Sequence, residues 1–166
     1  MRGFLKLLIV LICGSLMVIW LPVAPSFAED PPTYSLTAPE TISFGDFTNV
    51  MQYEKTGLII TAYTDDQTKS KITINVEDTK NNTKGYLTLG GTDDNLKILS
   101  NPLNIQGGII SSYSPVTSTL YLVNEGNLDN GNYSLNFSVQ QNITSSDLSK
   151  TAGEYKIILT FTAIFQ

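Results

Sequence analysis

Apolar and polar residues alternate along much of the chain from residue 41 onward. Residues 133–139 read Tyr-Ser-Leu-Asn-Phe-Ser-Val, and residues 71–77 alternate in the same way. Because successive side chains of a β-strand point to opposite faces, each run predicts a strand with one face in a core. The odd positions of residues 155–165 are apolar too, with Ile158 and Ile164 between them. This last run therefore predicts a strand that is partly covered on both faces.

Shorter runs of the same kind predict further strands, at residues 35–38, 41–47, 58–63, 85–89, 96–99, 109–113 and 119–123. Clusters of Asn, Asp and Gly between them suit turns, because these residues tolerate positive φ. Many short strands with regular turns predict an all-β fold, an antiparallel β-sandwich that is immunoglobulin-like in general architecture. The sequence predicts one short helical turn within residues 144–152, with Ser145 or Ser146 as its N-cap.

The first 28 residues have the pattern of a secretory signal peptide. Arg2 and Lys6 precede an apolar run over residues 7–21, and Ser26-Phe27-Ala28 supplies small residues at a cleavage site. A retained membrane anchor is the alternative. An uninterrupted span needs about 20 predominantly apolar residues, and this run is shorter and ends at Pro22. We therefore expect cleavage after Ala28.

Cleavage would leave 166 minus 28, or 138, residues. A single domain of that size buries about two thirds of the surface that its unfolded chain exposes. We predict an extended lead-in over residues 29–40 and one β-sandwich domain over residues 41–166. Cys13 is the single cysteine and lies in the leader, so the domain would depend on core burial without a disulfide.

The charge of the processed chain limits its partners. Without Arg2 and Lys6, 8 lysines face 15 acidic residues, a net charge of −7 with no arginine. The processed chain therefore lacks the cluster of basic side chains that phosphate contacts require, and nucleic acid is a poor partner. An anionic membrane surface is disfavoured for the same reason. Carbohydrate, a cationic surface or another protein remain open.

The residue types present argue against an enzyme. The chain contains no histidine, and the processed chain would contain no cysteine. A Ser-His-Asp triad, a Cys-His pair and zinc sites built on His and Cys are therefore excluded. Ser70-Lys71 and Ser149-Lys150 are adjacent pairs, and neighbours on a strand face opposite ways. We predict neither catalytic residues nor a cofactor.

Acidic pairs raise the question of calcium, which prefers several oxygen ligands from one loop or from converging loops. The pairs lie at residues 65–66, 77–78 and 93–94, and residues 127–131 come nearest to a calcium-loop spacing. None matches the full pattern. We interpret these residues as turn residues that bond their own backbone, and we predict no metal site. Calcium at the acidic loops stays an open alternative.

Three segments carry a family resemblance. Residues 42–47 read ISFGDF, residues 72–79 read ITINVEDT and are followed by GYLTL at 85–89, and residues 151–162 read TAGEYKIILTFT. In order and position they resemble the WxL domain, a cell-surface module of Gram-positive bacteria. Tyr86 and Phe161 stand where that family has its signature tryptophans. Thr88 and Ala163 replace the leucines that follow them.

The resemblance implies a secreted protein held non-covalently on the cell surface. Its partner would be cell-wall glycan or peptidoglycan, with other surface proteins as further partners. Tyr86 and Phe161 would be the ligand-binding residues, because aromatic faces offer large flat apolar areas to sugars and aliphatic groups. Phe161 also shares the face of Leu159 and Phe165, which favours a place in the core.

A second function is compatible with the same sequence. Residues 157–165 have high β propensity and carry no charge. An unpaired strand of this kind readily pairs with another chain. The alternative is therefore a structural subunit that assembles by β-strand pairing or exchange into a surface polymer.

Overall fold

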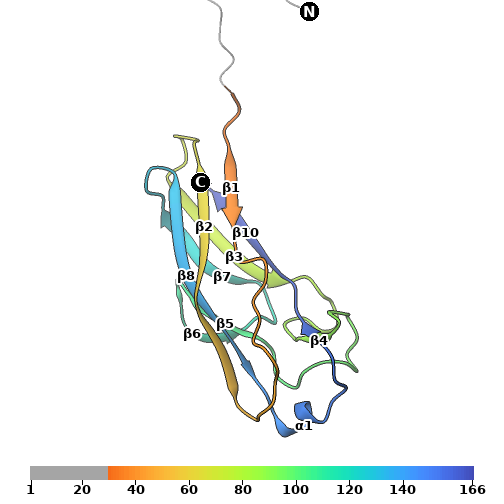
Figure 1. Cartoon of the computed structure of the whole chain (residues 1–166). Coiled ribbons are helices and arrows are strands. Elements are labelled where there is room, and N and C mark those ends of the chain that lie inside the picture. The colour runs from red at the N-terminus through yellow and green to blue at the C-terminus, as the bar shows by residue number, and fades with distance from the viewer. Residues whose placement is uncertain (1–29) are drawn as a thin grey trace, which may run out of the picture. The chain divides into compact units, whose positions relative to one another are not determined.

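The computed structural model describes residues 30–166, and residues 32–166 form one compact unit. The predicted signal peptide at residues 1–28 lies outside the described residues. The described chain is nearly all β, with antiparallel sheets and one short helix (Figure 1). The predicted all-β, sandwich-like fold is confirmed. Within residues 30–166 there is no helix with the length and apolar character needed to cross a bilayer.

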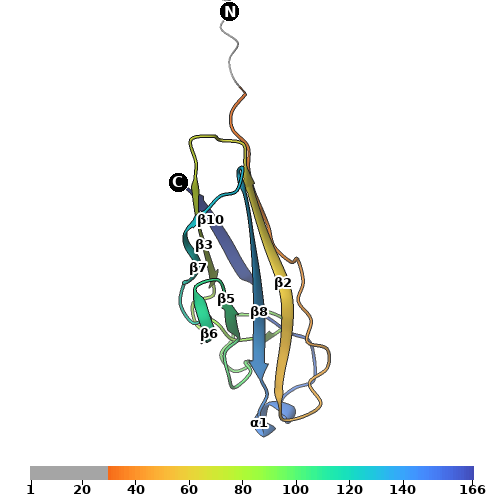
Figure 2. The ribbon, with the colours of Figure 1, turned by 90° about the vertical axis from the view of Figure 1, so that its left-hand side faces the viewer.

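The larger sheet has five antiparallel strands in the order β1 (Tyr34–Thr37), β2 (Gln52–Thr64), β8 (Asn132–Asn142), β5 (Asn104–Gly107) and β6 (Ile110–Pro115). It faces a three-stranded sheet in the order β10 (Leu159–Phe165), β3 (Lys71–Asp78) and β7 (Leu120–Asn127) (Figure 2). The short strands β4 (Thr88–Leu89) and β9 (Tyr155–Lys156) form a third, two-stranded sheet. The helix α1 (Ser145–Leu148) follows β8.

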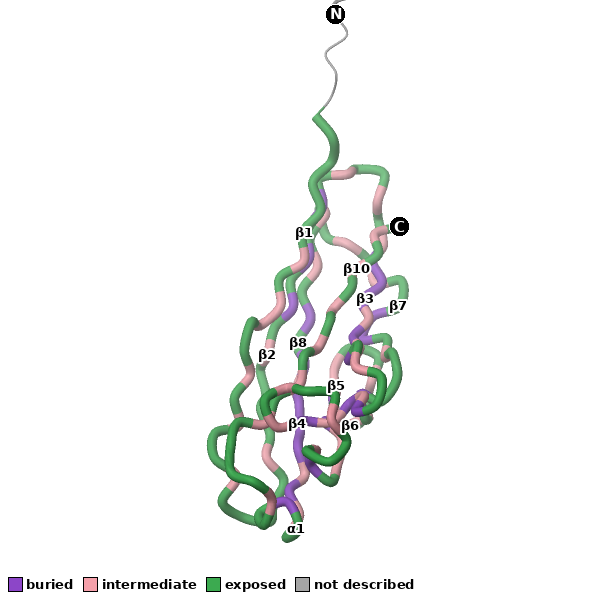
Figure 3. Tube along the Cα trace, turned by 90° about the vertical axis from the view of Figure 1, so that its right-hand side faces the viewer, coloured by how far each residue is buried: buried purple, intermediate pink, exposed green. Residues whose placement is uncertain are grey.

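The core lies between the two larger sheets, where the alternation predicted it. Ile72, Ile74 and Val76 of β3 are fully buried, and they face Ile60 of β2 and Phe137 of β8. Figure 3 shows buried residues concentrated on the central strands of both sheets. The three β3 side chains follow one another at every second position, so a single face of the strand supplies them.

Strand β1 lies inside the predicted lead-in. Its residues pair with β2 from Tyr34 opposite Thr64 to Thr37 opposite Thr61. The rings of Tyr34 and Phe165 lie 5.3 Å apart, so β1 and β10 approach each other where the two sheets meet. Residues 34–37 are therefore part of the folded domain.

Two predicted strands are wrong. Residues 41–47 follow the alternating rhythm but form no strand, because no neighbouring strand pairs with their backbone. Residues 96–99 form a turn with one isolated bridge at Ile98. The Asp94 carboxylate accepts the Leu96 amide at 2.9 Å, and local side-chain bonding of this kind competes with strand pairing.

Other boundaries differ for local reasons. Residues 85–89 shorten to β4, because Gly85 has a φ of 84° and the Tyr86 amide closes a turn onto Thr83 at 2.9 Å. The closing run splits into β9 and β10 around residues 157–158. β2 extends to Gln52 through a bulge at Gly57, whose φ is 69°.

The sequence prediction missed β5 and misplaced the helix cap. β5 has four residues between two turn clusters, so its alternation is too short to stand out, yet it pairs with both β8 and β6. The N-cap of α1 is Thr144 rather than Ser145 or Ser146. The Asp147 carboxylate three residues later accepts the Thr144 amide at 2.9 Å, which fixes the start of the helix.

Candidate functional site

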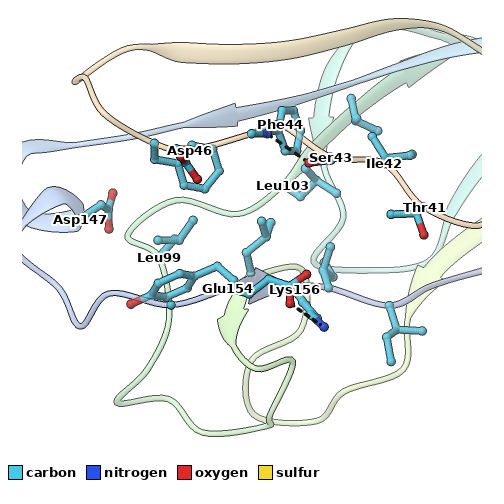
Figure 4. A pocket seen from close by; sticks show the side chains of 18 of the residues that line it. Thr41, Ile42, Ser43, Phe44, Asp46, Leu99, Leu103, Asp147, Glu154 and Lys156 are labelled. Atoms are coloured by element: carbon cyan, nitrogen blue, oxygen red, sulfur yellow. Dashed lines mark hydrogen bonds and ion pairs between the residues drawn. The ribbon is translucent and has the colours of Figure 1, made fainter.

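The described residues enclose an open cleft of about 930 Å³ at the α1 end of the sandwich (Figure 4). One wall is the irregular segment 39–47, and the other is formed by residues 147–161. The floor between them is apolar and consists of Leu87, Leu99, Leu103 and Val139. The volume lies in the range of small-ligand sites, which are typically apolar with a few polar groups.

The first wall presents apolar side chains on an unpaired backbone. Ile42, Phe44 and Phe47 are half-buried and pack against the core. Phe47 contacts Tyr53 edge to face, with ring centroids 4.9 Å apart. Over residues 39–47, the one hydrogen bond among the described residues runs from the Gly45 amide to Ser43 Oγ, at 3.2 Å. The alternating side chains hold this segment in place, and its peptide groups remain open to a partner.

The second wall contains the free edge of β10. β10 pairs with β3 on one side and is the edge strand of its sheet on the other. Its inward residues Leu159 and Phe161 are only half-buried. No residue within 30–166 covers these two side chains completely. Ile158, just before β10, is 68% exposed and lines the cleft. An edge strand with this composition is suited to pairing with another chain.

A polar cluster closes one end of the cleft. The Asp147 side chain is 1% exposed and accepts hydrogen bonds from Lys150 Nζ at 2.6 Å and from Ser100 Oγ at 2.7 Å. Lys150 Nζ also donates to the Ile98 carbonyl at 2.7 Å. The cluster ties α1 to residues 98–100, which carry part of the cleft floor.

The electrostatics of this cluster follow from its hydrogen bonds. Desolvation by burial alone raises the pKa of Asp147, but bonds from Lys150, the Thr144 amide and Ser100 outweigh it and hold the pKa well below the usual carboxyl range. Ser100 Oγ lies 3.1 Å from Lys150 Nζ, a distance that would suit a serine–lysine catalytic pair. However, Lys150 Nζ donates to Ser100 Oγ, to the Asp147 carboxylate and to the Ile98 carbonyl, so all three of its donors are in use. This cluster is therefore built as a structural tie.

The two residues suggested by the family resemblance lie in different surroundings. Phe161 lines the cleft and packs on Phe137, with ring centroids 5.6 Å apart. Tyr86 is half-buried but is not among the residues that line the cleft. Its carbonyl accepts Lys80 Nζ at 2.9 Å, which holds the turn before β4. The structure therefore does not bring Tyr86 and Phe161 together in this cleft.

The acidic residues accept backbone amides, some of their own turn, as Asp66 does from Thr68 and Asp94 from Leu96, and some of another segment. The Asp93 carboxylate accepts the amides of Asn82 at 3.0 Å and Thr83 at 2.9 Å. Desolvation raises the pKa of Asp93, but these bonds and the Thr83 hydroxyl lower it below its ordinary value. Hydrogen bonds from Thr68 and Tyr34 lower the pKa of Asp66 to about 2. Among residues 30–166, no group of three potential metal-ligating side chains is close enough to hold an ion.

Sequence reasoning missed most of the cleft. Leu99 and Leu103 come from loops distant in sequence from Phe161 and meet it only through the fold. Glu40 and Asp46, on the first wall, form no hydrogen bond or ion pair among the described residues. The alternation in residues 41–47 did indicate an inward apolar row. It gave no sign that the segment lacks a pairing partner.

No protein-family model, curated protein or solved structure matches this chain. The resemblance to the WxL domain therefore depends on the three segments quoted above and stays a prediction.

Proposed function

We propose that this protein is an exported, non-catalytic cell-surface module that associates non-covalently with the cell wall. The cleft between residues 39–47 and 147–161 carries this proposal. In a closed sandwich, inward residues such as Leu159 and Phe161 would be fully buried, whereas here they remain partly accessible. Contiguous apolar surface of this kind, rimmed by polar residues, is typical of binding sites.

Three further observations support a binding role at the surface. The leader pattern of residues 1–28 supports export. The resemblance to the WxL domain supports peptidoglycan as the wall partner. The absence of histidine from the sequence and the ion pair that engages Lys150 support binding without catalysis.

Retention on purified peptidoglycan tests the proposal. The processed protein should co-sediment with peptidoglycan sacculi above the level of an unrelated β-sandwich. Ile158→Lys, which places a charge in the apolar cleft, should weaken retention about tenfold, equivalent to about 1.4 kcal/mol of lost apolar contact. Ile59→Lys is the matched control, because Ile59 is 51% exposed on β2 and does not line the cleft. Equal retention of the wild-type protein and the unrelated domain would contradict the proposal.

A second candidate function is assembly by strand pairing, and the free edge of β10 favours it. Ile158 and Ile164 are 68% and 47% exposed, and β10 carries no charge. Edge strands in stable monomers usually carry charge, proline or a covering segment.

Size-exclusion chromatography over a range of concentrations checks this candidate. Assembly predicts concentration-dependent oligomers that Thr162→Lys, a charge on the edge strand, would abolish. Thr61→Lys on the exposed face of β2, which is paired on both sides, should leave them unchanged. A wild-type protein that stays monomeric at millimolar concentration would rule assembly out.

A further inference from the structure

We infer that the part of the wall polymer held in the cleft is an extended peptide with a free amino group, rather than the glycan strand. This inference rests on the proposed function and names the ligand class of the same site. Two features of the cleft carry it. They are the unpaired peptide groups of residues 39–47 and of the outer edge of β10, and an unneutralised negative charge on residues 39–47.

The walls offer backbone groups that match a peptide. Residues 39–47 have no backbone–backbone hydrogen bond among the described residues, and β10 is unpaired on its outer edge. Gly45, whose φ is 76°, interrupts the extended backbone of residues 41–47, so a short peptide could pair with the backbone on either side of it. On the second wall, residues 155–156 already pair with β4, and the open edge is that of β10 at Leu159 and Phe161. Peptide N–H and C=O groups pair with such edges by strand addition.

The side chains of the cleft do not by themselves separate a sugar from a peptide. The lining includes no Asn, Gln, Arg or Trp, but the Phe44, Tyr155 and Phe161 rings and several carboxylates would also suit a sugar. The floor of Leu87, Leu99, Leu103 and Val139 suits small aliphatic side chains of a peptide. The backbone and the charge of the cleft therefore carry the choice of ligand.

The charge of the lining favours a cation. The two lysines of the lining form ion pairs, Lys150 with Asp147 at 2.6 Å and Lys156 with Glu154 at 2.9 Å. Glu40 and Asp46 have no partner among the described residues and leave two uncompensated negative charges on the first wall. Figure 4 shows Asp46 on the wall opposite the Glu154–Lys156 pair, with Leu99 and Leu103 between. An ammonium group on a bound peptide would neutralise this charge.

The test compares peptidoglycan sacculi in three forms: untreated, with free amino groups acetylated, and as glycan freed of its peptides by an amidase. We expect retention on untreated sacculi, roughly three- to tenfold weaker retention after acetylation, and none on glycan alone. Glu40→Gln with Asp46→Asn should weaken binding to untreated sacculi by a similar factor and make it insensitive to acetylation. Glu125→Gln, an exposed carboxylate outside the cleft, is the control.

Failure of the inference is distinct from failure of the proposed function. Equal binding of untreated sacculi and peptide-free glycan, or no effect of acetylation, would overturn the inference while wall association stands. Calorimetry with the soluble Nα-acetylated tetrapeptide Ac-Ala-γ-Glu-Lys-Ala, whose one amine is the lysine Nε, and with its Nε-acetyl form measures binding without the wall. If only the free amine binds, the ligand class holds even where sacculi are not retained. Equal binding of the two peptides, or binding of neither, would overturn the inference.

Discussion

Asp147 is the residue on which the geometry of the cleft floor depends most. Its carboxylate is buried and accepts hydrogen bonds from Thr144 and Lys150, which flank α1, and from Ser100 in a separate loop. A buried carboxylate is stable only when its charge is compensated, so these contacts position residues 98–100 and α1 together.

The variant Asp147→Asn should lower the free energy of unfolding by about 2 kcal/mol at pH 7. The amide keeps the shape but loses the charge that satisfies Lys150 and the donors around it. Urea denaturation of the variant measures the loss. Asp129→Asn is the control, because the Asp129 side chain bonds only to the neighbouring Asn130.

The same carboxylate predicts a pH dependence. The pKa of Asp147 is lowered in the folded protein, so its contribution is fully present above the unfolded pKa near 4 and is lost as pH falls toward the folded pKa. The stability difference between the wild-type protein and Asp147→Asn should therefore narrow from pH 4 to pH 2. A difference that stays constant over this range would show that the ionised carboxylate is not the stabilising group.

At the scale of elements, the sequence predicted strands well where a strand is paired with another strand on each side. β3 and β8 alternate strictly, and each lies between two other strands, so the inward row is buried. Residues 41–47 alternate equally well, and Ile42 and Phe44 turn inward as predicted. Side-chain periodicity records which face is apolar, but it carries no information on whether a neighbouring backbone is available for pairing.

Local bonding and a single glycine account for two further errors of the prediction, the strand expected at residues 96–99 and the length of β2. In residues 94–97, the Asp94 carboxylate and carbonyl accept amides of its own loop, which removes them from any sheet. Gly57 hides the length of β2, because its bulge reverses the apolar phase between Lys55 and Leu58. A local hydrogen bond or a bulge depends on one or two residues, whereas an alternating pattern can be recognised only over several residues.

At the scale of the whole molecule, the two sheets meet closely where Tyr34 contacts Phe165, and they separate toward α1 to leave the cleft. The family resemblance suggested Phe161 as a ligand-binding residue, whereas the strand pattern favoured a place for it in the core. Glu40, Asp46 and the floor leucines were not found from the sequence, because only the tertiary fold brings residues 40–46, 99–103 and 161 to one place. The candidate site therefore forms where the sandwich is incompletely closed, and no sequence motif marks it.

Amide hydrogen exchange with and without a soluble wall fragment tests the central claim most directly. In the free protein, amides of residues 40–47 should exchange fast, while those of β3 and β8 should be protected, because only the latter lie in paired strands. Adding peptidoglycan fragments should slow exchange in residues 40–47 and 157–161 and leave β6 and β7 unchanged. Protection that appears elsewhere, with these two segments unaffected, would contradict the account.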